Sequence, residues 1–230
     1  MPTTPRSAYA HYCMLARTLE RLGDRWALLV VRDLVTGPRR FTDLMDRLGG
    51  ITPRTLTQRL RDLEADGLVL VDRVPGRREV WYSLTPAGID LAPALDELVL
   101  WGLRHLAALP APGEPTHPEH LLSALRLVLD REKLDVGPVT WVVRTRDHDD
   151  NYTISGRGGR WTLEDTAVPN PDIELLGTRR DLADYLTTLH PARAAGHPGV
   201  RVRGSEQEIS RFLGAIAAFP QPPRGPAPSV

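Results

Sequence analysis

The sequence of 230 residues contains a single cysteine, Cys13, so no disulfide bond can form within the chain. It contains no run of 18 apolar residues, which excludes a transmembrane helix of ordinary length. The segment 1–10 lacks the apolar stretch of a secretory signal. We therefore expect a cytoplasmic protein that has no membrane partner.

Common catalytic signatures are absent as well. The sequence has no G-x-S-x-G, H-E-x-x-H, P-loop or C-x-x-C motif. His117 and His120 have a spacing that could suit a metal ion, but they straddle the end of a linker and the start of a helix, which does not favour a metal site. Asp147, Asp149 and Asp150 are more typical of a solvated turn than of a calcium loop. We expect a protein that is not an enzyme and that holds neither a cofactor nor a metal.

The composition is that of an ordinary globular chain, 41% hydrophobic and 25% charged, with a length that suits two domains. The 29 basic residues balance 29 acidic ones, so the whole chain carries no net charge. Between Arg39 and Arg78, however, nine arginines stand against six acidic residues, a local net charge of +3. Because this excess is small, affinity for a nucleic acid would depend on where the arginines lie rather than on their number.

Residues 1–108 predict a definite order of elements. Helices are expected at 14–22, 24–36, 42–48, 52–66 and 85–106, and extended segments at 39–41, 68–74 and 79–84. Thr52-Pro53 is an N-cap followed by proline at the first helical position, which marks a helix start strongly, and Thr85-Pro86 repeats this signal. A helix of this size followed by a basic hairpin is typical of a winged helix-turn-helix, which favours binding of double-stranded DNA over catalysis.

The predicted helix at 52–66 has two distinct faces. At 100° per residue, Leu56, Leu60 and Leu63 fall on one stripe, which we expect to be buried. The opposite face and its flanks carry Arg54, Gln58, Arg61, Thr55 and Thr57. Arginine and glutamine can make forked hydrogen bonds to guanine or adenine, and threonine can contact a phosphate or a thymine methyl group. A merely solvated face is the alternative, and the surrounding order of elements favours DNA contact.

Arginines close to this helix predict contacts with the DNA backbone. Arg77 and Arg78 follow a Pro-Gly pair at the expected hairpin tip, where the alternative is a soluble turn. After a helix that reads bases, such arginines are expected to contact phosphates or the minor groove. Arg39 and Arg40, just before the third helix, are expected to add phosphate contacts.

Several segments resemble the HxlR family of bacterial transcription regulators over roughly residues 9–108. They are Cys13 and the segments 22–26 (LGDRW), 37–44 (GPRRFTDL), 50–60 (GITPRTLTQRL), 82–88 (YSLTPAG) and 101–102 (WG). The resemblance implies a homodimer whose interface is formed by the first and last helices of the domain. Two reading helices would then enter successive major grooves of an inverted-repeat operator, with half-sites about 34 Å apart. Such a regulator is cytoplasmic, and associated with the nucleoid when bound.

Two features of this domain keep alternatives open. Trp101 and the stripe of Leu91, Leu95 and Leu98 would line the dimer interface, or pack inside the domain, or do both. Cys13 stands where HxlR members often carry a cysteine, and several relatives are similar to redox or electrophile sensors.

A responsive thiol must be exposed and activated, and the nearest cation that could assist Cys13 is Arg17, one helical turn later. Without a second cysteine in the chain, sensing would need a disulfide between the Cys13 residues of two subunits or a mixed disulfide of Cys13 with a small thiol. The alternative for Cys13 is packing at a helix–helix contact.

A second domain is predicted after a proline-rich linker at 109–118. Helices are expected at 119–133, 178–189 and 205–219, and strands at 139–146, 152–155, 161–163, 172–177 and 200–204. This pattern predicts an α+β domain over 119–219. The tail 220–230 has five prolines and is expected to be disordered.

Within this region, 170–182 (NPDIELLGTRRDL) and 200–204 (VRVRG) resemble a sterol-carrier-protein-like (SCP2-like) domain. The resemblance implies an apolar cavity that accepts a small hydrophobic effector. Candidate lining residues are Trp141, Trp161, Leu175, Tyr185 and Phe212, which could equally be ordinary core. The domain would sense an effector or add dimer surface.

A lipid-binding carrier whose N-terminal module serves only for dimerisation is the main alternative. A dimerisation module has no need for the arginine-bearing face at Arg54, Gln58 and Arg61, and this face favours the regulator. A thiol-dependent enzyme that uses Cys13 ranks last, because no catalytic partner is identifiable.

Overall fold

The computed structural model describes residues 9, 11–73, 79–106, 114, 116–187 and 197–217. The expected hairpin tip with Arg77 and Arg78, most of the expected linker and the tail 220–230 lie outside the described residues. The chain divides into two compact units, Met1–Leu95 and Asp96–Val230. Each unit has its own apolar core and is described by itself.

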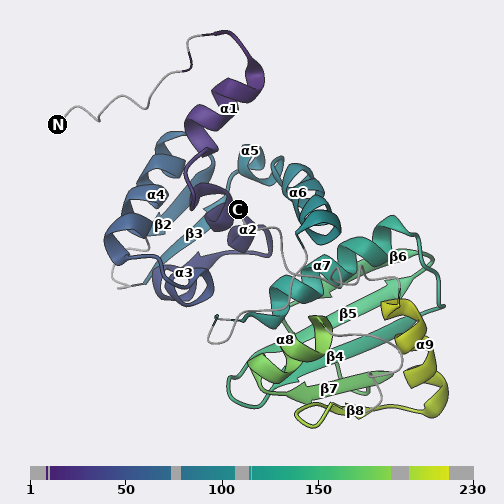
Figure 1. Ribbon diagram of the computed structural model, residues 1–230. Coiled ribbons are helices and arrows are strands. Elements are labelled where there is room, and N and C mark those ends of the chain that lie inside the picture. The colour runs from purple at the N-terminus through teal and green to yellow at the C-terminus, as the bar shows by residue number, and fades with distance from the viewer. Residues whose placement is uncertain are drawn as a thin grey trace. The chain divides into compact units, whose positions relative to one another are not determined.

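The N-terminal unit is helical, with one small sheet (Figure 1). Its elements are α1 (Met14–Leu22), α2 (Ala27–Val35), β1 (Arg39–Arg40), α3 (Phe41–Leu48), α4 (Pro53–Ala65), β2 (Val69–Arg73), β3 (Val80–Leu84), α5 (Pro86–Ile89) and the beginning of α6 (Ala92–His105). The strands are antiparallel in the order β1-β3-β2, with Tyr82 of β3 between Arg39 and Val71. Helices α2, α3 and α4 followed by the antiparallel pair β2–β3 give the winged helix-turn-helix order that the sequence predicts.

Local sequence explains where α4 and α5 begin. The Thr52 hydroxyl accepts a hydrogen bond from the Thr55 backbone N–H, and Pro53 occupies the first turn, where no donor is needed. Thr85 caps α5 in the same way through the backbone N–H of Gly88. The predicted caps of both helices are therefore confirmed.

The closing helix of this unit differs from the prediction. The sequence predicts one helix from Thr85 to Leu106, whereas the structure divides it into α5 and α6. Pro93 lies in the first turn of α6, and in an unbroken helix its ring would meet the carbonyl group of Ile89. The break therefore falls one turn before the proline.

The core of the N-terminal unit is assembled from all of its long elements. Buried residues are Leu22, Ala27, Val30, Val31, Leu34, Leu44, Leu48, Ile51, Leu56, Leu60, Leu63, Val69 and Leu84. Leu91 and Leu95 pack against them, half-buried. Because three of these leucines come from one stripe of α4, the opposite face of that helix is left outside the core.

The C-terminal unit combines a mixed sheet with helices. Its elements are the rest of α6, α7 (Pro118–Arg131), β4 (Val139–Thr145), β5 (Asn151–Arg157), β6 (Arg160–Glu164), β7 (Ile173–Gly177), α8 (Arg179–Thr187), β8 (Arg201–Arg203) and α9 (Glu206–Ile216). The strand order is β6-β5-β4-β7-β8, in which β4 and β7 are parallel and the other pairs antiparallel. These elements agree in type and order with the α+β pattern predicted from the sequence.

Two glycine positions shape this sheet. Gly158 and Gly159 join β5 to β6 with φ angles of 57° and 72°, the left-handed region that favours glycine in a tight hairpin. Gly156 lies opposite Trp161, and a Cβ atom at Gly156 would approach the indole ring to 2.8 Å. The indole therefore occupies space that a larger residue in β5 would fill.

Candidate nucleic-acid interface

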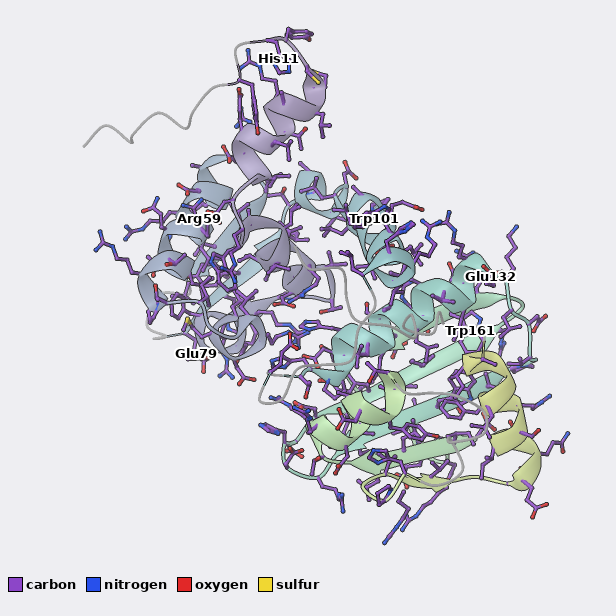
Figure 2. The ribbon with its side chains drawn as sticks, in the orientation of Figure 1. His11, Arg59, Glu79, Trp101, Glu132 and Trp161 are labelled. Carbon is purple, nitrogen blue, oxygen red and sulfur yellow. The ribbon has the colours of Figure 1, made fainter. Side chains whose placement is uncertain are left out.

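Helix α4 presents opposite faces to the core and to solvent. Leu56, Leu60 and Leu63 are buried, so the predicted apolar stripe is confirmed. The other side carries the exposed arginine face, a name used here for Arg54, Gln58 and Arg61, all of which are exposed. Figure 2 shows side chains projecting outward from α4, with Arg59 labelled on the same helix.

Two guanidinium groups of this face are available to a ligand. Neither Arg54 nor Arg61 forms a hydrogen bond or an ion pair with any residue that the structure describes. A neighbouring arginine behaves differently, since Arg59 is mostly buried and lies 3.2 Å from Asp62 and 3.5 Å from Asp24. The two free cations are therefore a local property of the exposed arginine face and not of α4 as a whole.

Thr55 and Thr57 lie half-buried beside this face. The hydroxyl groups of Thr55 and Thr52 are 2.8 Å apart, and the Thr57 hydroxyl donates to the carbonyl of Pro53 over 2.8 Å. The bond to Pro53 uses the hydroxyl hydrogen of Thr57. The methyl group of Thr57 and the lone pairs of its hydroxyl oxygen therefore remain for an external partner.

The two arginines of β1 already have partners within the protein. Arg39 donates to the Thr36 hydroxyl over 2.8 Å and is half-buried. Arg40 donates to both carboxylate oxygens of Asp43 over 3.3 Å and stacks over Trp81, 5.6 Å from the ring centroid. Both remain predicted phosphate contacts, but Arg39 is partly occupied by the Thr36 hydroxyl and the charge of Arg40 is partly neutralised by Asp43.

The pKa of Asp43 reflects this arrangement. Burial alone would raise the pKa of Asp43, but hydrogen bonds from the backbone and side chain of Arg40 outweigh it and hold the pKa below its ordinary value. Asp43 is therefore a charged anchor for Arg40 at the start of α3.

The hairpin adds an arginine that the sequence analysis did not select. Arg73 ends β2 with an exposed side chain, and its guanidinium lies 4.0 Å from Glu64 of α4. Its position as the last strand residue before the segment 75–78 (PGRR) is the signal that could have identified it. Arg73 lies on the strand that leads to Arg77 and Arg78.

Apolar side chains are exposed on α1 and α6. On α1, Met14, Leu15 and Leu19 are exposed, and Leu15 retains 65% of its accessible surface. On α6, Leu98 and Trp101 are 56% and 49% exposed, whereas Leu91 and Leu95, just before and within α6, are half-buried against the N-terminal core. The predicted leucine stripe thus divides into core residues and solvent-facing ones. Figure 2 labels Trp101 on α6.

Cys13 is the N-cap residue of α1 and is half-buried. The guanidinium of Arg17, the cation expected to assist it, donates instead to Glu20 over 3.1 Å. The sensing role of Cys13 stays a prediction.

The five candidate pocket residues of the C-terminal unit share one core. Trp141, Trp161, Leu175, Tyr185 and Phe212 are all buried. The Trp141 ring lies 4.9 Å from Trp161 and 5.0 Å from Phe212, centroid to centroid. The indole N–H of Trp141 is buried and has no hydrogen-bond partner among the described residues. Burial raises the pKa of Tyr185 to about 12.

Neither a metal centre nor a membrane span is found in the part of the chain that the structure covers. No three His, Cys, Asp or Glu side chains among the described residues gather so as to hold a metal ion. The described helices are all too short or too polar to cross a bilayer.

The fold and the exposed arginine face define a winged helix-turn-helix DNA-binding domain, and comparison with known proteins identifies its family. The model of the HxlR-like helix-turn-helix family matches residues 21–109, and the chain belongs to that family. The HTH-type transcriptional regulator YkvN of Bacillus subtilis is 41% identical over 93 residues, which are 39% of this chain and 77% of that protein.

A second curated relative is also a transcriptional regulator. The HTH-type transcriptional regulator sll1512 of Synechocystis is 40% identical over 88 residues, and the match covers 37% of this chain and 64% of that protein. The reduced form of the transcriptional regulator YodB from B. subtilis is 29% identical, with a TM-score of 0.36, over 40% of this chain and 92% of that chain. The curated relatives are transcriptional regulators, not enzymes.

Proposed function

We propose that this protein regulates transcription as a homodimer that binds an inverted-repeat operator through α4 of each subunit. The observation that carries the proposal is the pair of exposed guanidinium groups, Arg54 and Arg61, that have no partner among the described residues. A protein gains nothing in stability from such unpaired charges on a helix whose other side is fully packed. Placed in a major groove, they would meet the bidentate acceptors of guanine.

We assign the remaining predicted site residues either to the DNA bases or to the sugar-phosphate backbone of the DNA. We assign Gln58 to a base edge, and Thr55 and Thr57 to a thymine methyl group or a phosphate. Arg77, Arg78, Arg39 and Arg40 are assigned to phosphates or the minor groove. The partners that Arg39 and Arg40 already have support a smaller contribution from these two.

Dimerisation is supported by the exposed apolar residues of α1 and α6, since such groups are usually covered in an assembly. In the proposal, residues 1–108 serve DNA binding and dimerisation, and 119–219 form the second domain. A dimer of this kind presents two α4 helices to half-sites about 34 Å apart on one side of the duplex.

The second domain is proposed to be SCP2-like and to bind a small hydrophobic effector in the cytoplasm. The mixed sheet and the unpaired indole N–H of Trp141 inside an aromatic core support this, because a buried donor without a partner costs stability. Oxidation of Cys13 is a second proposed input. Loss of operator binding under oxidant that persists in Cys13→Ser would eliminate that input.

The proposal is tested by selecting bound duplexes from random DNA with the full-length chain. Wild-type protein should enrich an inverted repeat, and Arg54→Ala or Arg61→Ala should weaken binding to it by about 1–3 kcal/mol and relax base preference. Arg157→Ala is the charge-matched control, because Arg157 is exposed at the end of β5 in the C-terminal unit. Equal effects of all three substitutions, or no enriched sequence, would overturn the proposal.

A further inference from the structure

One side chain of the exposed arginine face is held in place by the protein itself. The Gln58 side-chain amide donates to Asp62 Oδ1 over 2.9 Å, one turn further along α4. The second carboxylate oxygen of Asp62 lies 3.2 Å from Arg59 Nη1, and the same guanidinium lies 3.5 Å from Asp24. Asp24 accepts a hydrogen bond of 2.9 Å from the backbone N–H of Trp26. Asp62 is therefore anchored by a chain of contacts that ends at the backbone just before α2.

The chemistry of this contact fixes the orientation of the Gln58 amide. A carboxylate only accepts hydrogen bonds, so the amide must turn its NH2 group toward Asp62. A glutamine without such a neighbour can rotate by half a turn and exchange the positions of donor and acceptor. With one N–H given to Asp62, the amide keeps its carbonyl oxygen and one N–H for an external partner. Neither atom has another partner among the described residues.

We infer that Asp62 positions Gln58 to read adenine in preference to guanine, an inference that rests on the proposed DNA binding of the same helix. In the major groove, adenine offers the N7 acceptor beside the N6 donor, whereas guanine offers two acceptors, N7 and O6. One acceptor and one donor in a fixed order complement adenine. Because Asp62 retains one N–H, the amide cannot present two donors to guanine, and its carbonyl oxygen would face O6.

Asp62 is a positioning residue in this account and touches no base. Its removal should change which base is preferred without removing the group that makes the contact. This separates it from Arg54 and Arg61, whose removal deletes contacts outright. The readout is therefore the ratio of affinities for two operators that differ at one base pair.

The test uses the full-length protein and the operator enriched by the wild type. The base pair under Gln58 is the one at which Gln58→Ala loses discrimination, and wild type should prefer adenine over guanine there by about tenfold, within the range of one bidentate contact. Asp62→Ala should reduce that ratio to about twofold or less. Asp62→Asn keeps an acceptor oxygen and should retain most of the preference. Adding Asp62→Ala to Gln58→Ala should change nothing further.

Glu64→Ala is the matched control, because it removes the same charge from α4 at an exposed position away from Gln58. It should leave the adenine-to-guanine ratio at the wild-type value even if it raises affinity for all sequences. An unchanged ratio in Asp62→Ala, or a wild-type preference for guanine at the Gln58 position, would overturn the inference while leaving the proposed function intact. Enrichment of no sequence by the wild type would contradict the proposed function itself.

Discussion

At the scale of single residues, the arginines of the N-terminal unit use their charge in two ways. Arg40 and Arg59 are held by carboxylates, and Arg40 also lies over the Trp81 ring. Arg54 and Arg61 project from α4 without a protein partner among the described residues. All four arginines carry the same formal charge, so charge alone does not tell which of them are paired within the protein. The partners of Arg40 include Trp81 and Glu79, about forty positions further along the chain, which sequence spacing does not bring together.

A prediction at this scale concerns the titration of Tyr185. Burial raises the pKa of Tyr185 from 10.0 to about 12 because the charged phenolate is disfavoured in the core. The folded state therefore holds its proton more tightly than the unfolded state does. This stabilising contribution is fully present below pH 10.0 and is lost as the pH rises through about 12.

The measurement is the urea midpoint of the full-length chain at a series of alkaline pH values. The midpoint of the wild type should fall as the pH rises from 10.0 to about 12. The midpoint of Tyr185→Phe should fall less steeply, because phenylalanine has no proton to lose. Tyr12→Phe is the control, since Tyr12 is 83% exposed. A Tyr185→Phe slope equal to that of wild type would refute the assignment.

At the scale of elements, the caps of α4 and α5 could be predicted because they depend on residues within one turn, whereas α2 and α3 begin after Trp26 and Arg40 and not at Asp24 and Thr42. Thr52 and Thr85 each accept the backbone N–H that their position in the sequence predicts, and Ser205 caps α9 in the same way. The break between α5 and α6 was missed, although Pro93 carried the signal. The helical spacing of apolar residues continues across Pro93 and predicts one helix, although a proline inside a helix clashes with the carbonyl group four residues earlier.

The candidate site shows the same division. The two faces of α4 follow from the helical period and could be predicted residue by residue. The contact between Gln58 and Asp62 also has the i, i+4 spacing of a helical pair, but spacing alone does not say which side chains are already occupied. Whether Asp62 is already held by other groups depends on Arg59, which in turn contacts Asp24 from another part of the chain.

A prediction at the element scale tests the packing of β5 against β6. Gly156→Ala should destabilise the C-terminal unit by about 1–3 kcal/mol, because the added Cβ would meet the Trp161 ring, which is itself buried. Gly214→Ala is the matched control, since a Cβ there meets nothing within 4 Å and alanine favours the helix. Chemical unfolding followed by tryptophan fluorescence measures both. Equal stability of the two variants would contradict the packing described for Trp161 (labelled in Figure 2).

At the scale of the whole molecule, the proposed activity requires two copies of the chain. One α4 helix offers few base contacts, and an inverted repeat is recognised through two of them. The exposed apolar residues of α1 and α6 are the surfaces best suited to hold two copies together. Their chemistry favours a buried interface over a solvent-facing role.

Substitution of one such residue should dissociate the dimer. Leu15→Asp places a charge on the exposed apolar side of α1 and should raise the dimer dissociation constant by at least about tenfold, since burial of an unpaired charge is costly. Val35→Asp, at the exposed end of α2, is the control. Sedimentation equilibrium measures both. A Leu15→Asp protein that remains as dimeric as Val35→Asp would place the interface elsewhere.

The most direct test of the central claim is protection of guanine N7 from methylation along the selected operator, because N7 lies in the major groove. Wild-type protein should protect guanines in two major-groove segments about one helical turn apart on one side of the duplex. Arg54→Ala and Arg61→Ala should lose protection in both segments, whereas Arg157→Ala should keep it. Operator binding that leaves every N7 accessible, or protection that the α4 substitutions do not alter, would contradict the account.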